Sequence, residues 1–394
     1  MNNEVKLHIH SVLYSLIVFL LNGTLLQTFL LESGLDEQTV TFSLSVLQIA
    51  QMLTIFLFSQ AVDKMSRIKR FTALSFLICV PLNVYFLCLS FNPGVDTPVP
   101  FLVLGIAFNI FLGLYNVISY KLPYNVIEIE RYGIFTSYSG LFCGVVSFLA
   151  SIGIVALQGF LPYFTVMRAM YILSLIFIGL AIVTTLSMKE TELPVIGAEL
   201  KRSKSILKYK HFTALIIPNI LRGFCFGILG MASTIGYYIG DIDSTSASVL
   251  VTVTTISSIS ASLIYTFLNS KVREKHTLIF SSVCVFIFLA LMVAFNNTAA
   301  FIIFYGLAYF FLQLINIAVP IVVVKLVDYD VIGQYSGGRM LLHTLGLSLS
   351  GFVCIPLFKL IGVFPTMVLS GLTQLISGIV YYIYLTKNEK GKIT

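Results

Sequence analysis

The stretch VDKMSRIKRF, residues 62–71, places one acidic and four basic residues between two long apolar runs. Each of these runs has about the 20 residues that an α-helix needs to cross a bilayer. The whole chain is 58% hydrophobic and 10% charged, whereas about a quarter of the residues of a soluble domain are charged. The charged stretch is therefore expected to connect two membrane-spanning helices at the membrane surface.

Twelve apolar runs of spanning length occur in the 394 residues, which predicts an all-α integral membrane protein with twelve transmembrane helices. The runs lie at 11–31, 41–61, 71–91, 100–120, 134–158, 163–187, 212–239, 248–268, 277–295, 299–324, 340–359 and 363–386. An even number of spans places both termini on the same side. His8 and His10 precede the first run and are expected to face the cytoplasm. The six cysteines fall inside apolar runs, which indicates buried packing residues and no disulfide framework.

Basic residues gather in every second connecting segment. Most of the 24 Lys and Arg lie at the N-terminus, in 62–70, 121–131, 188–210, 271–275 and 325–339, and at the C-terminus. The intervening loops carry acids instead: Glu32, Asp36, Glu37, Asp96, Asp241 and Asp243. Because cytoplasmic loops of membrane proteins are enriched in Lys and Arg, both termini are predicted to be cytoplasmic in a multi-pass protein of the plasma membrane. The net charge of +7 then reports topology, and no nucleic-acid partner is expected.

The polar, Lys-rich segment 188–211 divides the chain near its midpoint. It predicts an N-terminal six-helix bundle over 1–187, a cytoplasmic linker over 188–211 and a C-terminal six-helix bundle over 212–394. Two loops repeat at a nearly constant offset: VDKMSRIKR (62–70) with LNSKVREKH (268–276), and KLPYNVI (121–127) with KLVDYDVI (325–332). Such an echo is typical of transporters built from two related halves, so the two bundles are expected to be pseudo-symmetric.

The stretch from Asp63 to Arg70 resembles the loop signature of the major facilitator superfamily, G-x-L-x-D-R-x-G-R-[RK]-x-[RK], with Ser59 and Ser66 in place of glycines. Two more loops resemble its glycoside–pentoside–hexuronide branch: LPYNVIEIER, with Pro123, Glu128, Glu130 and Arg131, and DYDVIGQYSGGR, with Asp328, Tyr329, Asp330, Gly337 and Arg339. The resemblance implies solute transport by alternating access. Runs 41–61 and 100–120 lack the carboxylates that serve sodium or proton coupling in that branch.

The charged cytoplasmic residues are predicted to form a gate. Salt bridges would form and break as the bundles rock, and the candidate gating residues are Asp63, Arg67, Glu130, Arg131, Asp330 and Arg339. The alternative is that these charges only anchor helix ends to anionic headgroups.

Arg222 is the one ionisable residue near the middle of a predicted span, where charges are costly and therefore candidates for function. It either holds an anionic or hydroxyl-rich solute or satisfies neighbouring carbonyls. Arg168 is expected to be peripheral. His343 follows Arg339 by one turn and either binds a carbonyl or relays protons.

Uncharged polar residues recur at helical spacing in the runs that face the cavity in the family that the chain resembles. Stripes run along 100–120 and 299–324, the second including Tyr305. With Arg222, the predicted substrate-binding set is Asn22, Gln27, Asn109, Asn116, Tyr120, Tyr309, Gln313 and Asn316. The alternative for each is an interhelical hydrogen bond, worth about 0.6 kcal/mol.

The resulting functional prediction is a secondary active or facilitative transporter of a small polar solute, a sugar or glycoside first. An organic-anion exchanger or uniporter using Arg222 is an alternative, as is a non-transporting receptor or scaffold with a transporter fold. The expected partners are the solute, the bilayer and a coupling proton or counter-solute, and the chain is expected to be monomeric. No metal-ligand cluster, nucleophile constellation or cofactor motif occurs, so no enzymatic activity, metal or cofactor is predicted.

Overall fold

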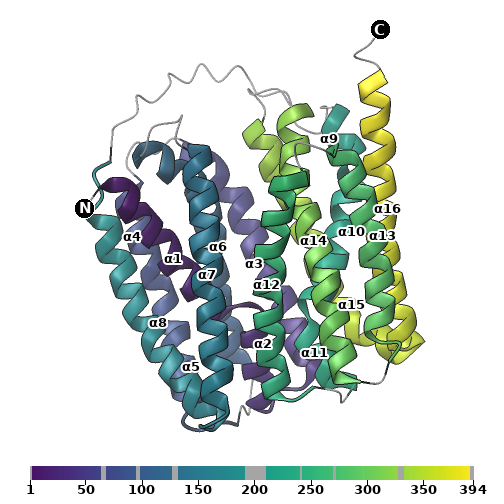
Figure 1. Ribbon diagram of the computed structural model, residues 1–394. Helices are drawn as coiled ribbons and strands as arrows, with labels where there is room; N and C mark the ends of the chain where they lie inside the picture. The colour runs from purple at the N-terminus through teal and green to yellow at the C-terminus, as the bar shows by residue number, and fades with distance from the viewer. Residues whose placement is uncertain are drawn as a thin grey trace. The chain divides into compact units, whose positions relative to one another are not determined.

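The computed structural model describes residues 2–63, 68–94, 98–126, 132–190, 210–239, 242–268, 272–295, 297–326 and 332–390. The chain forms two compact units, Met1–Lys201 and Arg202–Thr394. The N-terminal unit contains α1 (Asn3–Leu21), α2 (Gly23–Glu32), α3 (Glu37–Asp63), α4 (Lys69–Ser75), the 3-10 turn η1 (Phe76–Ile78), α5 (Cys79–Leu89), α6 (Val99–Val126), α7 (Tyr132–Gln158) and α8 (Tyr163–Leu186) (Figure 1). The C-terminal unit contains α9 (Lys210–Ala214), α10 (Ile216–Gly230), α11 (Ala232–Ile239), α12 (Ser244–Leu268), α13 (Glu274–Met292), α14 (Thr298–Leu326), α15 (Ile332–Ile361) and α16 (Val363–Lys390).

The described part of the chain is helical and contains no strand. Within it, 11 helices are long and apolar enough to cross a membrane, or 12 if the bent pair α10 and α11 is one span. This confirms the predicted fold class of a multi-pass all-α membrane protein. The expected linker, 188–211, falls mostly on residues that the structure does not describe, so the predicted domain boundaries stay predictions.

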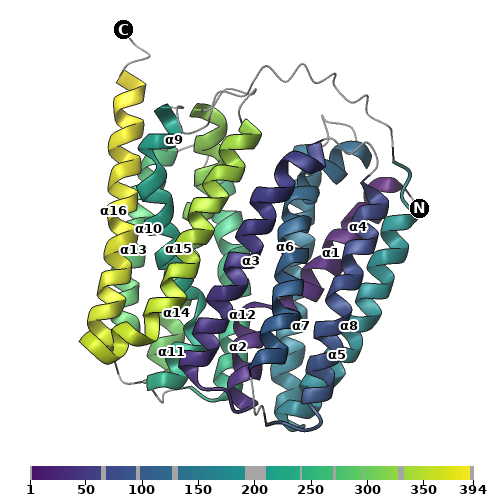
Figure 2. The ribbon, with the colours of Figure 1, turned by 180° about the vertical axis from the view of Figure 1, so that it is seen from behind.

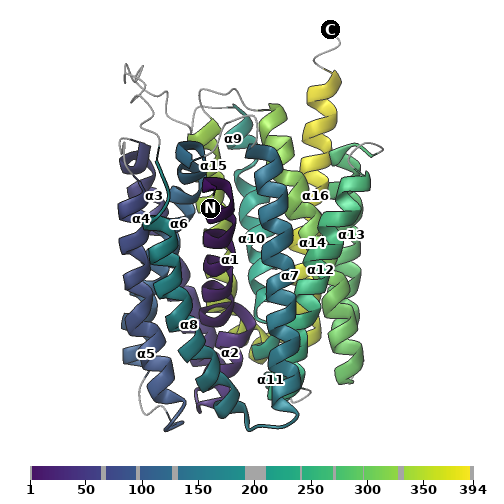
Figure 3. The same ribbon diagram turned by 60° about the vertical axis from the view of Figure 1, so that its left-hand side comes forward.

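The same helix pairings occur inside each unit. In the N-terminal unit α1 packs against α7 and α8 (Figure 3), α3 against α6, and α5 against α6 and α8. In the C-terminal unit the corresponding helices make the corresponding pairs: α10 with α15 and α16, α12 with α14, and α13 with α14 and α16. The predicted pseudo-symmetry of the two bundles is therefore present in the packing of each.

Each unit has its own apolar core. Aromatic side chains fill the N-terminal one, where Phe29, Phe86 and Tyr171 have ring centroids 5.1–5.5 Å apart. Large apolar side chains also cover the outside, as with Phe56 and Leu57 of α3, which are 63% and 64% exposed. An apolar exterior of this kind suits hydrocarbon rather than water.

Only Cys79, Cys225 and Cys354 are buried, so the prediction of six buried cysteines is wrong: Cys88 is exposed, and Cys143 and Cys284 are partly exposed.

The first and seventh spans are both interrupted at corresponding places. Asn22 is extended (φ −146°, ψ 170°) between α1 and α2, and its Oδ1 accepts a hydrogen bond from Gly23 N at 2.8 Å. The break between α10 and α11, at Met231, bends the chain by 54°. Interrupted helices at matching positions of two halves are the strongest sequence-level pointer to a transporter's binding region.

Gly23 has a backbone φ of +69°, and a Cβ added there would meet no atom within 4 Å. Gly23→Ala is therefore expected to cost only the strain of a left-handed L-residue, roughly 1–2 kcal/mol. Gly140→Ala is the control, because Gly140 lies inside α7, also in open space, and alanine is the better helix former by about 1 kcal/mol. Thermal unfolding of the purified proteins should show a lower midpoint for Gly23→Ala and no decrease for Gly140→Ala. Equal midpoints for both would contradict the strained-turn interpretation.

The charged segment after α3 is described from residue 68 onward. The Glu190 carboxylate accepts hydrogen bonds from the backbone N–H of Ile68 at 2.6 Å and of Lys69 at 3.4 Å. Lys69 Nζ donates to the Met188 carbonyl at 2.8 Å. A carboxylate at a helix N-terminus is favourable because it satisfies free N–H groups and the helix dipole. In this part of the loop, the charged side chains of Glu190 and Lys69 therefore connect the start of α4 to the residues that follow α8.

Candidate functional site

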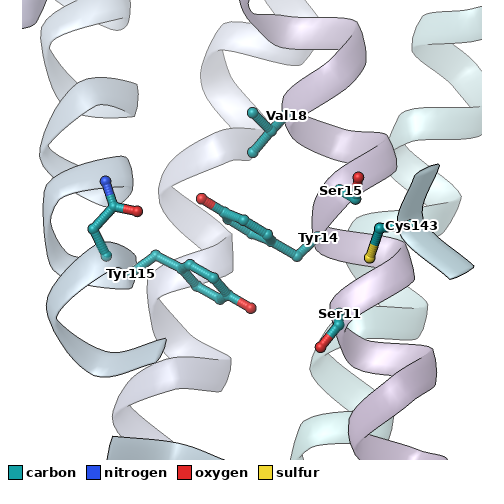
Figure 4. A pocket seen from close by; sticks show the side chains of 7 residues that line it. Ser11, Tyr14, Ser15, Val18, Tyr115 and Cys143 are labelled. Carbon is teal, nitrogen blue, oxygen red and sulfur yellow. The ribbon is translucent and has the colours of Figure 1, made fainter. Parts of the chain in front are cut away.

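A pocket with polar groups in its lining lies in the N-terminal unit. Its volume is about 390 Å³, and its lining comes from α1, α6 and α7: Ser11, Tyr14, Ser15, Val18, Tyr115, Asn116 and Cys143 (Figure 4). The four α1 residues follow the spacing i, i+3, i+4, i+7, so one face of the helix supplies them. A pocket of this size is near the lower end of the range for small-molecule sites.

Two tyrosines form an aromatic platform beside this pocket. The rings of Tyr14 and Tyr115 stack with centroids 3.5 Å apart and planes 11° from parallel (Figure 4). Asn116 follows Tyr115 on α6 and adds an amide that can donate and accept hydrogen bonds. Ser15 lies 3.3 Å from Ser147 on α7, measured between the hydroxyl oxygens. The arrangement combines a ring-stacking surface with hydrogen-bonding groups.

His10 holds the Tyr115 hydroxyl in place. The Thr185 hydroxyl donates to the Ala181 carbonyl at 2.6 Å, so His10 Nδ1–H donates to Thr185 Oγ1 at 2.7 Å. Nε2 then accepts from the Tyr115 hydroxyl at 2.9 Å. His10 is therefore a neutral, fully buried histidine inside α1. The expectation that His8 and His10 precede the first helix is wrong, because α1 begins at Asn3. His10 does not face the cytoplasm either, since it is buried and its ring nitrogens are satisfied within the bundle.

The predicted substrate-binding residues of the N-terminal unit lie at different places. Asn116 lines the pocket, while Asn22 caps α2 at the helix break. Gln27 is buried in α2, and Asn109 is buried in α6, where its Nδ2 donates to the Gly105 carbonyl of its own helix at 3.0 Å. Tyr120 belongs to α6, and its side chain lies outside the described part. Solute binding by these residues stays a prediction.

Arg222 belongs to α10. This helix packs against α15 (Figure 2). A Cβ on the next residue, Gly223, would overlap the backbone carbonyl of His343, and a Cβ on Gly346 would overlap the Ile220 carbonyl. The two backbones approach this closely only because glycine has no side chain. Arg222 is 3% exposed, and neither its Nε nor its Nη1 has a hydrogen-bond partner among the described residues.

Arg339 and His343 lie one turn apart on α15 and share this region with Arg222. The positive charges of Arg222 and Arg339 are close enough to repel each other, and both interact electrostatically with the His343 ring. The predicted gating residue Arg339 and the predicted proton-coupling residue His343 thus gather with the predicted solute-binding Arg222 in one cluster of the C-terminal unit. Their individual roles stay predictions.

Arg168 has partners for part of its guanidinium, although its Nε, like that of Arg222, has none among the described residues. Its Nη2 donates to the Ser90 carbonyl at 3.0 Å, and its guanidinium carbon lies 3.8 Å from the centroid of the Phe91 ring. Both partners follow the end of α5, so Arg168 joins α8 to that helix end. The carbonyl hydrogen bond and the cation–π contact indicate a structural role for Arg168.

The polar stripe of α14 forms a connected chain. The Tyr309 hydroxyl lies near the side chains of Gln313 and of Ser258 of α12. Asn316 Nδ2 lies 3.4 Å from Gln313 Oε1, and the rings of Tyr305 and Tyr309 have centroids 5.9 Å apart. The spacing prediction for Tyr309, Gln313 and Asn316 thus identified residues that lie together, and solute binding by them stays a prediction.

Most of the predicted gate falls outside the described residues. The structure does not describe Arg67, Glu130, Arg131 or Asp330, and of Asp63 it describes only the backbone. The gating interpretation of these residues stays a prediction.

The residues that sequence reasoning missed are Ser11, Tyr14, Ser15, Tyr115, Cys143 and His10. The stripe along α1 was visible in the sequence, because residues 11, 14, 15 and 18 follow helical spacing. Tyr115 and Cys143 carried no such signal. Each is flanked mostly by apolar residues in a run of spanning length, so only the packing of α6 and α7 against α1 gives them a polar role.

Two bundles of apolar helices with matching internal pairings define a multi-pass helical membrane protein. The chain belongs to the Major Facilitator Superfamily, whose family model matches residues 7–351. Membership supports membrane solute transport as its general role.

Solved structures with the same fold cover almost the whole chain. The nucleoside transporter NupG is 19% identical, with a TM-score of 0.67 over 97% of this chain and 98% of its own. A mutant form of it is 17% identical, with a TM-score of 0.70 over 96% and 99%. A D-xylose–proton symporter is 12% identical, with a TM-score of 0.72 over 96% of each chain. Among curated proteins, none matches this chain.

Proposed function

We propose that this protein is a secondary transporter that moves a small, neutral, ring-bearing polar solute across the plasma membrane by alternating access. A sugar, glycoside or nucleoside has the required chemistry, because each combines a ring with several hydroxyl groups. The observation that carries the proposal is the pocket of about 390 Å³ with its stacked Tyr14 and Tyr115. The face of Tyr14 that does not stack on Tyr115 packs on the solute ring, and Asn116 and the serines bind the hydroxyls.

The structural neighbours support this substrate class by analogy. One is a nucleoside transporter and another a D-xylose–proton symporter, and the solutes in both names are hydroxyl-rich and contain a ring. The loop resemblance to the glycoside–pentoside–hexuronide branch points in the same direction. Cytoplasmic termini, a monomeric state and a coupling proton or counter-solute belong to this proposal.

An organic-anion exchanger or uniporter is the second candidate function. It is favoured by one specific observation: Arg222 is buried with two nitrogens that lack partners among the described residues. A buried charge without a counter-charge is unfavourable, so an anionic solute at Arg222 would relieve this cost.

Reconstitution of the full-length chain into liposomes tests both functions. Uptake of labelled D-xylose, a β-glycoside, uridine and lactate is measured with and without a proton gradient. We expect saturable uptake of a neutral ring-bearing solute, competed by its unlabelled form. Uptake of lactate alone would favour the second function. If a solute raises the melting temperature but none of the four is transported, the protein is a receptor with a transporter fold and the proposal fails.

A further inference from the structure

We propose that Arg222, Arg339 and His343 form a single binding site, in the C-terminal unit, for a small oxyanion that also carries a hydroxyl group. This inference deepens the second candidate function, since it names the site and the substrate class of anion binding. Inorganic phosphate, which at neutral pH has both negative oxygens and a hydroxyl, is the simplest molecule of this class.

The packing of α10 on α15 places the backbone that carries Arg222 next to the backbone that carries His343. Gly223 lies against the His343 carbonyl, and Arg222 precedes Gly223 in the chain. Arg339 and His343 are four residues apart on α15, so they lie on the same helix face. α16 closes the cluster from another side: the Ser377 hydroxyl donates to the Pro218 carbonyl at 2.9 Å and the Tyr381 hydroxyl to Asn219 Oδ1 at 3.1 Å.

The buried Arg222 and the half-buried Arg339 carry positive charge without compensation in the described part of the chain. The groups that act electrostatically on Arg222 are Arg339, another cation, and Tyr381, an uncharged phenol. Arg222 Nε, Arg222 Nη1 and Arg339 Nε have no hydrogen-bond partner among the described residues. Because removing a charge from water is costly unless it is paired, this arrangement favours an anion between the arginines. Guanidinium groups match the oxygens of carboxylates and phosphates.

Because of His343, the bound anion must also donate a hydrogen bond. Its side chain is 7% exposed, and Nδ1 has no partner within the described residues. The backbone carbonyl of Asn219 also lies near the ring, and the proposal places the ring proton on Nε2, the nitrogen other than the unpartnered Nδ1. In the neutral imidazole one nitrogen donates and the other accepts, so Nδ1 presents a lone pair to the cluster. A hydroxyl on the anion satisfies it.

The experiment measures the melting temperature of the full-length purified protein in increasing phosphate, with sulfate as the matched anion and chloride for ionic strength. Ligand that binds the folded state raises the melting temperature with concentration. We expect a saturable rise with phosphate and affinity at least about tenfold weaker for sulfate, which has no hydroxyl at neutral pH and leaves Nδ1 unsatisfied. No variant is needed for this comparison, so a folding defect cannot obscure it.

Arg222→Gln and Arg339→Gln are expected to abolish the phosphate response, and His343→Leu to remove the preference for phosphate over sulfate. Arg168→Gln is the matched control, because Arg168 is a membrane arginine that bonds Ser90 and Phe91, and it should keep the full response. An equal response in Arg222→Gln and wild type would overturn the site. The site would also be overturned if the wild type showed no phosphate response and Asp330→Asn did. Asp330 would then be the counter-charge of the arginines in the wild type.

Flux measurements separate this site from the function on which it rests. Phosphate binding without uptake of phosphate or of any organic anion keeps the site and removes anion transport. Saturable uptake of another anion by a protein that shows no phosphate response overturns the site and keeps anion transport.

Discussion

Tyr115→Ala is expected to reduce the affinity for the transported solute by about 10- to 100-fold, because Tyr115 supports the ring of Tyr14 from behind and stacking of a solute ring on an aromatic side chain contributes about 1–3 kcal/mol. The change removes the Tyr115 ring from the Tyr14–Tyr115 stack. It also removes the hydroxyl that donates a hydrogen bond to His10 Nε2. Uptake at low solute concentration in liposomes measures the effect.

Two further variants interpret this result. Tyr115→Phe keeps the ring and removes only the hydroxyl, so it should retain most of the stacking and lose the contact with His10. Tyr138→Ala removes a tyrosine of α7 that is 53% exposed, and it should transport like wild type. Wild-type uptake by Tyr115→Ala would place the solute outside this pocket and remove the observation that carries the proposed function.

Gly223→Ala is expected to lower the stability of the C-terminal unit strongly. The added methyl would overlap the His343 carbonyl, a backbone atom that cannot move aside as a flexible side chain can. Overpacking typically costs about 1–3 kcal/mol, and here α10 and α15 must separate to relieve it. Thermal unfolding and the yield of folded protein measure the effect.

Gly230→Ala is the control for this substitution, because Gly230 ends the same helix and its added Cβ would meet no atom within 4 Å. It should unfold near the wild-type temperature. If Gly223→Ala also unfolds there, α10 and α15 do not approach each other as closely as described, and the cluster of Arg222, Arg339 and His343 is not built as we infer.

Much of the architecture was predictable before any tertiary information. Span positions follow from local hydrophobicity, since each helix satisfies its own backbone hydrogen bonds and the bilayer requires a minimum apolar length. Helix ends were less predictable: α1 begins at Asn3 rather than near residue 11, because polar groups such as His10 are buried against neighbouring helices. Lone polar residues were equally hard to interpret, as with Asn109, which bonds its own helix.

The composition and order of residues alone determined that this chain is a multi-pass helical membrane protein with two related halves, because span length, loop charge and loop repetition are properties of short segments. Only the tertiary structure decided which polar groups meet. In helices that are apolar on almost every side, periodicity does not specify which face turns inward, so rotation and depth are set by packing. The close approach of α10 to α15 at glycine places Arg222 beside His343, and the packing of α6 on α1 stacks Tyr115 on Tyr14.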